Sequence, residues 1–311
     1  MNKKNPCALI TGISGQDGSY LTELLLRKNY KIIGVTRNIE TTEAKLPFEL
    51  KSKIDLVSWD FIDQQEIIDI LLDNHPDEIY NFAAYSSGAG MYDNPIDISK
   101  INGLSVALIL ESIRLTDPNI RFCQASSSEM YGYVEDSPQS ESTRFKPRSP
   151  YGAAKLYAHA MIEIYRQQYG LFACSAILFN HESPRRGLEF VTRKITHGAA
   201  MIKLGQVKEL HLGNLEARRD WGYAGDYVYA MSLMVSHTEA GDYVIATEKT
   251  HSVREFCKIA FNHLGLNYLD YIHVDKSIYR PPEPYQLVGS HNKAKHILKL
   301  EPLPSIDAPP D

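Results

Sequence analysis

Short apolar segments that alternate with segments of helical periodicity constrain the fold of this 311-residue chain most strongly. The apolar segments predict strands at Cys7–Thr11, Lys31–Thr36, Ile54–Ser58, Glu78–Phe82, Ile120–Ala125 and Phe172–Leu178. The helical spacing predicts helices at Tyr20–Lys28, Gln64–Asn74, Ile101–Leu115 and Tyr151–Tyr169. Strands and helices in alternation form a parallel sheet that helices cover on both faces. The pattern therefore predicts an α/β fold built on a Rossmann-type, doubly wound parallel sheet.

A glycine-rich turn, TGISGQDG, follows the first predicted strand and opens the first predicted helix. Glycines with this GxxGxxG spacing let backbone N–H groups approach a pyrophosphate, and the helix N-terminus favours its negative charge. A tight turn without a ligand is the structural alternative, and a glycine triplet alone does not decide between the two. We predict a dinucleotide-binding site that includes Gly12, Ser14, Gly15, Gln16, Asp17 and Gly18.

The ends of the second and third predicted strands bear on the choice of dinucleotide. An acidic residue after the second strand would bind the ribose 2′-hydroxyl of NAD, whereas an arginine accommodates the 2′-phosphate of NADP. Arg37 stands at that position, so we expect NADP rather than NAD, with a solvated surface cation as the alternative. Asp60 follows the third strand, where its carboxylate could accept from the adenine amine or cap the helix near Asp63.

The segment SPYGAAK places Tyr151 and Lys155 four residues apart, on one face of a helix. A nearby ammonium favours phenolate, so we expect Lys155 to lower the pKa of Tyr151. Such a phenol can exchange a proton with a sugar hydroxyl while hydride leaves the same carbon. We expect the small residues that begin with Gly152 to let a cofactor approach the helix. An exposed surface pair is the alternative.

The segment SSSEMYG, residues 126–132, brings three hydroxyls and a carboxylate to the end of a predicted buried strand. Taken alone, it predicts a polar turn with Glu129 facing water. A carboxylate beside a hydroxyl, a phenol and an ammonium is needed only if a proton other than that of the oxidised hydroxyl must be removed. We expect Tyr131 to pack against cofactor or sugar.

Together these motifs resemble the extended short-chain dehydrogenase/reductase family. Within it, the chain is similar to the GDP-mannose 4,6-dehydratases in the segments ALITGISGQDGSYL, SPYGAAKLYA, LFNHESPRRGLEFVTRK, LGNLEARRDWGYAGDYV and HSVREF. The resemblance spans most of the chain. It implies a lyase of nucleotide-sugar metabolism and deoxysugar biosynthesis, which converts a GDP-sugar into its 4-keto-6-deoxy form by internal hydride transfer through NADP.

The resemblance also implies roles for individual residues. Tyr151, assisted by Lys155, takes the proton of the sugar 4-hydroxyl, and Ser127 hydrogen-bonds to the forming ketone. Glu129 removes the C5 proton and then protonates the departing water. The further cofactor contacts that it implies are Phe82, Ala84, His181 and Arg186. The substrate contacts that it implies are Ser86, Ser128, Asn180, Lys194, Arg219, Arg280 and Glu283.

Two segments depart from the family pattern. Residues 84–92, AYSSGAGMY, replace a run that touches the sugar, which leaves open whether the sugar is mannose, a heptose or another hexose. A redox-only GDP-sugar 4-oxidoreductase or 4-epimerase is therefore an alternative, and a non-catalytic NADP-binding protein is a third. The residues after Arg37 lack the serine-rich loop that joins subunits in the family, so we expect either a homodimer or a homotetramer.

The loss of clear periodicity after about residue 180 suggests two domains. We predict an NADP-binding Rossmann domain at residues 1–178, to which segments of roughly 212–246 return, and a smaller, mainly nucleotide-sugar-binding lobe at residues 179–311. The net charge of −5 gives no general attraction to nucleic acid or anionic lipid. Four cysteines without CxxC spacing predict free thiols rather than a metal site or disulfides. The N-terminus does not read as a signal peptide and no apolar run spans a bilayer, which predicts a cytoplasmic protein without a membrane partner.

Overall fold

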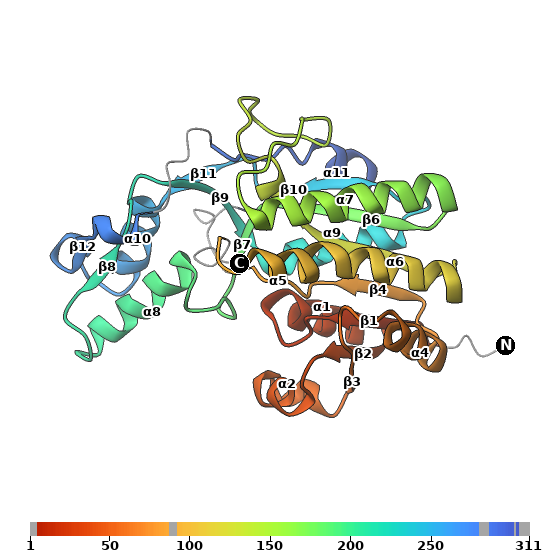
Figure 1. The fold of residues 1–311 in the computed structure, drawn as a ribbon. Coiled ribbons are helices and arrows are strands. Elements are labelled where there is room, and N and C mark those ends of the chain that lie inside the picture. The colour runs from red at the N-terminus through yellow and green to blue at the C-terminus, as the bar shows by residue number, and fades with distance from the viewer. Residues whose placement is uncertain (1–4, 87–91, 280–285, 302, 305–311) are drawn as a thin grey trace.

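A seven-stranded sheet forms the centre of the computed structural model, which describes residues 5–86, 92–279, 286–301 and 303–304. The strand order is β10-β6-β5-β4-β1-β2-β3, and every neighbouring pair is parallel (Figure 1). The strands are β1 (Cys7–Thr11), β2 (Lys31–Thr36), β3 (Ile54–Ser58), β4 (Glu78–Asn81), β5 (Arg121–Ser127), β6 (Ala173–Leu178) and β10 (Asp242–Ile245). The predicted Rossmann-type α/β fold is confirmed. The order reverses between β1 and β4, which is where open α/β sheets bind their ligands.

Both faces of this sheet are buried, which explains why its strands read as continuous apolar runs. In β1, Ala8 and Ile10 pack into the core on one face, whereas Cys7 and Leu9 pack into the core on the other. The first face is covered by α1 (Gln16–Arg27), α9 (Ala224–Ser236) and α11 (Asn292–Ile297). The second face is covered by α4 (Gln64–Asn74), α6 (Ser105–Thr116) and α7 (Pro150–Tyr169).

Short helical elements connect the strands and the longer helices. They are α2 (Ile39–Lys45), α3 (Phe48–Lys51), α5 (Pro95–Ser99), a π-helical turn at Lys100–Leu104 and 3₁₀ turns at Ser128–Met130, Tyr268–Asp270 and Lys276–Ile278. The 3₁₀ turn at Ser128–Met130 follows β5 directly and carries part of the site described below.

A smaller lobe lies to one side of the sheet, at the left in Figure 1. Its strands are β7 (Asn180–Glu182), β8 (Leu210–Leu212), β9 (Arg218–Tyr223), β11 (Thr250–Ser252) and β12 (Ile272–Val274). They form one sheet of order β11-β9-β7 and a pair β12-β8, packed with α8 (Val191–Lys203) and α10 (Val253–His263) around their own core. Between β9 and β11, α9 and β10 return to the large domain.

The lobe is joined to the large domain without a flexible linker. Only Phe179 separates β6 of the large sheet from β7 of the lobe, and this residue is buried. Its backbone N–H donates to the carbonyl of Ile245 in β10 at 3.0 Å. The two sheets are therefore anchored to each other at this point.

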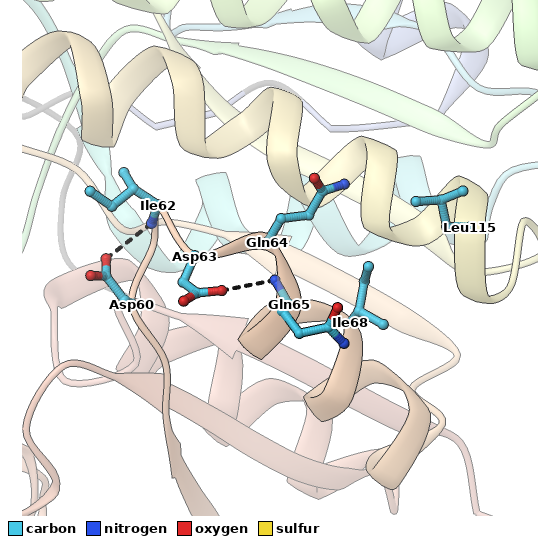
Figure 2. Close-up of a pocket in the computed structure, with 7 residues that line it drawn as sticks. All are labelled: Asp60, Ile62, Asp63, Gln64, Gln65, Ile68 and Leu115. Atoms are coloured by element: carbon cyan, nitrogen blue, oxygen red, sulfur yellow. Dashed lines mark hydrogen bonds between the residues drawn. The ribbon is translucent and has the colours of Figure 1, made fainter.

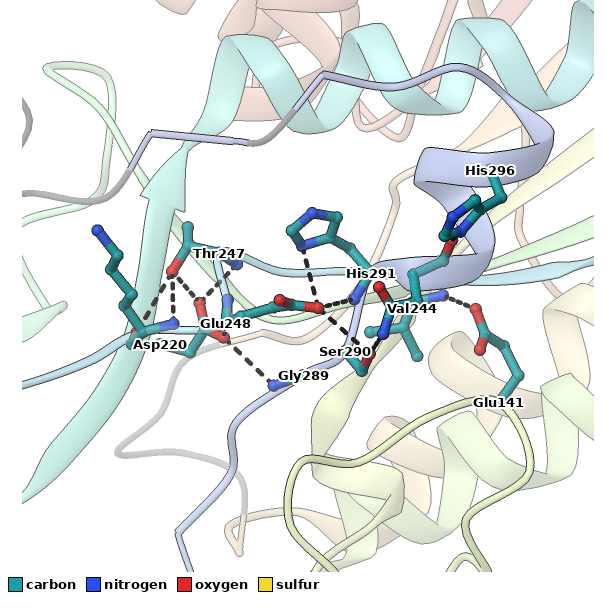
Figure 3. A network of polar contacts seen from close by, with 11 residues as sticks. Glu141, Asp220, Val244, Thr247, Glu248, Gly289, Ser290, His291 and His296 are labelled. Atoms are coloured by element: carbon teal, nitrogen blue, oxygen red, sulfur yellow. Dashed lines mark hydrogen bonds and ion pairs between the residues drawn. The ribbon is translucent and has the colours of Figure 1, made fainter.

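A buried carboxylate also joins segments that lie far apart in the sequence (Figure 3). Asp220 of β9 is 1% exposed, and its oxygens accept from the backbone N–H groups of Thr247, Glu248 and Gly289 and from the Thr247 hydroxyl. Burial raises the pKa of Asp220. The bond from Gly289 ties the described segment 286–301 to β9 of the lobe.

Two further observations concern chemistry outside the site. All four cysteines are free and buried. Across the residues that the structure describes, no helix is both long and apolar enough to cross a membrane, and no group of three or more histidine, cysteine or acidic side chains could hold a metal ion.

Candidate active site

A cavity of about 960 Å³ opens at the carboxyl edge of the large sheet, between that sheet and the smaller lobe. Helix α7 and strand β5 contribute one wall, and β7, α8 and β9 contribute the other. The predicted site residues that line it are Asp17, Phe82, Ala84, Ser86, Ser127, Ser128, Glu129, Tyr151, Lys155, Asn180, His181, Arg186, Lys194 and Arg219. The fold therefore brings together side chains that are spread over about two hundred residues of sequence.

The SSSEMYG segment continues β5 to Ser127 and then turns into the cavity wall. The Ser127 hydroxyl accepts from the backbone N–H of Glu129 at 3.2 Å and hydrogen-bonds to Tyr151. Tyr131 does not face the cavity, contrary to our expectation. It is fully buried, donates to the carbonyl of Ser140 at 2.7 Å and packs against Phe145.

Helix α7 presents Tyr151 and Lys155 to the cavity from its first two turns. Ser149 caps the helix by accepting from the Gly152 N–H at 3.1 Å, and Pro150 occupies the first turn. We expected Gly152 to make room for a cofactor, but it makes room for the protein backbone. A Cβ there would lie 2.5 Å from the backbone oxygen of Glu129, so Gly152 lets the helix pack against the turn after β5 rather than against a cofactor.

Burial, rather than Lys155, has the largest effect on the pKa of Tyr151. Burial raises the pKa of Tyr151 to about 12, although the hydrogen bond with Ser127 opposes this. Lys155 is 2% exposed, and its Nζ donates to the carbonyl of Ala125 at 2.8 Å and lies 5.8 Å from the Tyr151 ring centroid. Burial lowers the pKa of Lys155 itself to about 8. Desolvation, which the motif cannot report, dominates both groups.

Glu129 enters the cavity wall beside a cation that the sequence analysis missed. Its Oε2 lies 3.6 Å from Nε of Arg148, and the two side chains are 19% and 8% exposed. Glu129 Oε2 is buried and accepts no hydrogen bond from the described residues. A carboxylate that is shielded from water but not saturated by protein donors is available to a substrate proton.

The glycine-rich turn has the geometry of an anion-binding helix start. Gly12 has a φ of +65°, and a Cβ on Gly18 would lie 2.5 Å from the Gly12 oxygen, so both positions require glycine. Gly15 stands at the N-cap of α1, where no side chain within the described residues accepts from the helix amides. Those amides can therefore hold a phosphate.

His181 and Asp17 form a buried pair that joins this helix start to β7. The ring nitrogens of His181 lie 2.9 Å from Oδ2 of Asp17 and 2.8 Å from the carbonyl of Phe179. Both neighbours are acceptors, so the arrangement favours the doubly protonated, cationic ring. Burial alone would lower the pKa of His181, but the charge and hydrogen bond of Asp17 raise it. Burial alone would raise the pKa of Asp17, but His181 holds it below its ordinary value.

Three cations predicted to contact cofactor or substrate lie on the lobe side of the cavity. The Arg186 guanidinium stacks 3.5 Å from the Phe190 ring centroid and pairs with Glu182 at 3.2 Å. Lys194 donates to the carbonyl of His211 at 2.8 Å. Arg219 donates to the carbonyl of Arg218 at 2.7 Å. Arg280 and Glu283 lie outside the described residues.

Arg37 and Asp60 do not line this cavity, although they follow β2 and β3 at the same edge of the sheet. Both are exposed. Asp60 lies in a separate pocket of about 640 Å³ beside the start of α4, where its Oδ1 accepts from the Ile62 N–H at 3.0 Å (Figure 2). Asp63, not Asp60, caps α4.

Glu182, Phe190 and Arg148 are site residues that motif analysis did not find. Glu182 and Phe190 line the cavity, and both contact Arg186. Glu182 belongs to the HESPRRG segment, in which only His181 and Arg186 were predicted to contact the cofactor. Arg148 belongs to a loop without periodicity, so no sequence signal related it to Glu129.

Solved structures with the same architecture include a dTDP-glucose 4,6-dehydratase and RMD. A dTDP-glucose 4,6-dehydratase from Bacillus anthracis in complex with NAD superposes with a TM-score of 0.82 at 21% identity, covering 96% of this chain and 91% of its own. RMD from Pseudomonas aeruginosa, complexed with NADPH, gives 0.81 at 22% identity, covering 96% and 94%. The fold, the glycine turn and the Tyr151–Lys155 pair match the pattern predicted for an extended short-chain dehydrogenase/reductase.

A family model described as GDP-mannose 4,6 dehydratase matches residues 9–308. The chain belongs to the GDP-mannose 4,6-dehydratase family, as its motifs predicted. GDP-mannose 4,6 dehydratase 2 of Arabidopsis thaliana is 46% identical over 310 residues, covering 95% of this chain and 82% of its own. GDP-mannose 4,6 dehydratase of Homo sapiens is 41% identical over 334 residues, covering 99% and 90%.

Proposed function

We propose that the chain is a lyase that removes water from GDP-mannose, or from a related GDP-hexose or heptose, to give a GDP-4-keto-6-deoxy sugar. Family membership supports the GDP-sugar and the 4,6-dehydration. The observation that carries the proposal is the placement of the Glu129 carboxylate in the same cavity wall as Ser127 and Tyr151. A redox-only enzyme needs a hydroxyl and a phenol at C4, but it needs no base for C5.

The chain's own residues perform the proton transfers. Tyr151 accepts the proton of the 4-hydroxyl, and Ser127 donates a hydrogen bond to the ketone oxygen that forms. The ketone acidifies C5, so Glu129 takes the C5 proton and delivers it to the 6-hydroxyl, which leaves as water. C5 is then reprotonated. The proton that Tyr151 took from the 4-hydroxyl equals the proton that C5 gains, so the overall reaction neither releases nor consumes a proton. Lys155 holds the end of β5 through Ala125 and places its charge below the phenol.

The proposal includes a bound nicotinamide dinucleotide, and we infer NADP rather than NAD. The uncapped amides of α1, its glycines and the cavity beyond Asp17 fit such a group. Arg37, exposed at the end of β2, supports the 2′-phosphate. When bound, the nicotinamide would accept hydride from C4 and return it to C6, and its oxidised ring would add a positive charge that favours the Tyr151 phenolate.

Mass spectrometry of a GDP-mannose reaction in deuterium oxide tests the proposal. We expect a product that has lost one water and carries solvent deuterium at C5. Glu129→Gln, which keeps the shape of the side chain without its charge, should bind substrate and oxidise C4 but release no dehydrated product. Dehydration by that variant at the wild-type rate would refute the role of Glu129. A wild-type product that keeps its C6 oxygen would identify a redox-only enzyme instead.

A further inference from the structure

Arg148 reaches Glu129 because two loop segments pack backbone to backbone. The Tyr133 N–H donates to the Lys146 carbonyl at 2.9 Å, and the Lys146 N–H donates to the Met130 carbonyl at 3.1 Å. Gly132, with a φ of +55°, makes this approach possible, since a Cβ there would lie 2.2 Å from the Lys146 oxygen and 2.9 Å from the Arg148 nitrogen. The turn that carries Glu129 and the loop that carries Arg148 therefore form one unit.

Helix α7 closes this unit from the other side. Arg148 directly precedes Ser149, the N-cap of α7, and the Gly152 position lies against the Glu129 backbone. A shift of Arg148 is therefore coupled to Glu129 and to the helix start that presents Tyr151. Through Gly132 and Gly152, the chain fixes the relative positions of a carboxylate, a guanidinium and a phenol.

The charges in this unit are shielded from solvent. Arg148 is charged at every physiological pH, and its side chain is 8% exposed. Its Nε lies 3.6 Å from Oε2 of Glu129, which is close enough for strong attraction in a partly buried site. Exposed ion pairs contribute little, but removing one partner of a buried pair leaves the other charge uncompensated.

We propose that Arg148 is a positioning residue that holds the Glu129 carboxylate, through Oε2, in the orientation needed for proton transfer at C5 of the sugar. Arg148 does not line the cavity, so it acts through Glu129 and not on the substrate. Oε2 accepts no hydrogen bond from the described residues, so the carboxylate keeps the capacity to take the C5 proton. This inference rests on the proposed function and assigns a residue to its second step.

The test separates the C5 step from the C4 step. Exchange of solvent deuterium into C5 of the GDP-4-keto-6-deoxy sugar requires the base but no hydride transfer. The burst of reduced-nicotinamide absorbance on mixing enzyme with GDP-mannose reports C4 oxidation. The variants are Arg148→Met, which removes the charge but keeps most of the length, and Arg148→Lys, which keeps the charge. Arg144→Met, which removes an exposed arginine of the same loop, is the matched control.

We expect Arg148→Met to slow C5 exchange on the order of 10- to 100-fold, a part of what a positioned general base contributes. The rate of C4 oxidation and the KM for GDP-mannose should stay within about twofold of wild type, because Arg148 does not line the cavity. Arg148→Lys should recover part of the exchange rate, and Arg144→Met should equal wild type.

Unchanged C5 exchange in Arg148→Met would overturn the inference, and so would an equal loss in both steps, which would indicate a general structural role. If Arg148→Met does not fold, Arg148→Gln replaces it, and the same results support or contradict the inference. Glu129→Gln separates this inference from the proposed function. Normal exchange in Glu129→Gln contradicts the function itself, whereas loss in Glu129→Gln with normal exchange in both Arg148 variants contradicts only the role of Arg148.

Discussion

Replacing Gly132 by alanine tests the close packing around Glu129 directly. The residue has a left-handed backbone with φ +55°, and its missing Cβ would lie 2.2 Å from the Lys146 carbonyl oxygen. Gly170, at the C-cap of α7, is a matched control. Its φ is +68°, but no heavy atom of the described residues lies within 4 Å of its Cβ position.

The expected magnitudes follow from these two environments. A left-handed conformation costs an alanine about 1–2 kcal/mol of folding free energy relative to glycine. Gly170→Ala should therefore destabilise the protein by about that amount. Gly132→Ala also forces a methyl group into backbone atoms, which costs a further ~1–3 kcal/mol. We expect a total of about 2–5 kcal/mol for Gly132→Ala.

Equilibrium unfolding in urea measures both values. The chain has two tryptophans, Trp59 and Trp221, both buried, so their fluorescence reports unfolding of the large domain and of the lobe. With the slope against urea unchanged, the shift of the midpoint gives the difference in the free energy of unfolding. Equal destabilisation by the two substitutions would refute the reasoning, because it would mean that the contact with Lys146 carries no cost.

Further predictions concern the site and its supports. Tyr151→Phe should abolish the burst of reduced-nicotinamide absorbance while GDP-mannose still binds, as calorimetry can check; a normal burst would contradict the role of the phenol. Asp17→Asn should destabilise the protein most between about pH 4 and pH 6.5. The stabilisation from the raised pKa of His181 is complete below pH 6.5 and is lost as pH rises through that raised value. The stabilisation from the lowered pKa of Asp17 is complete above pH 3.8. A thermal-unfolding difference that grows toward high pH would contradict this sign. Arg37→Ala should weaken binding of NADP by about tenfold or more and leave NAD unaffected, measured by titration of the cofactor-free protein; equal effects on both would remove Arg37 from the 2′-phosphate site.

The large domain was predictable because its strands are buried on both faces. The bounds of β1, β2 and β3 agree with the predicted apolar runs, and β1 and most of β2 are buried. Helix α1 begins at Gln16, four residues before the predicted start, because its first turn is polar and has no apolar spacing to detect. The strands of the lobe are mostly three residues long and partly exposed, which leaves too little periodicity to recognise.

The site was predictable where a residue's position along the chain fixes its position in the fold. Ser127 ends β5 and the glycine turn follows β1, so both lie at the carboxyl edge of a parallel sheet. Arg148 was not predictable, because its contact with Glu129 depends on how two loops pack around Gly132. The effect of burial on the pKa values of Tyr151 and Lys155 was not predictable, since a motif reports which charge is near but not how much water is excluded.

The single buried residue between β6 and β7 restricts how the protein can move. Phe179 is the whole connection between the two sheets, and its carbonyl hydrogen-bonds to the His181 ring. The short connection leaves little room for the two sheets to separate at this point. Under the proposed function, the hydride acceptor is regenerated in every cycle, and such a connection suits a coenzyme that is retained from one turnover to the next.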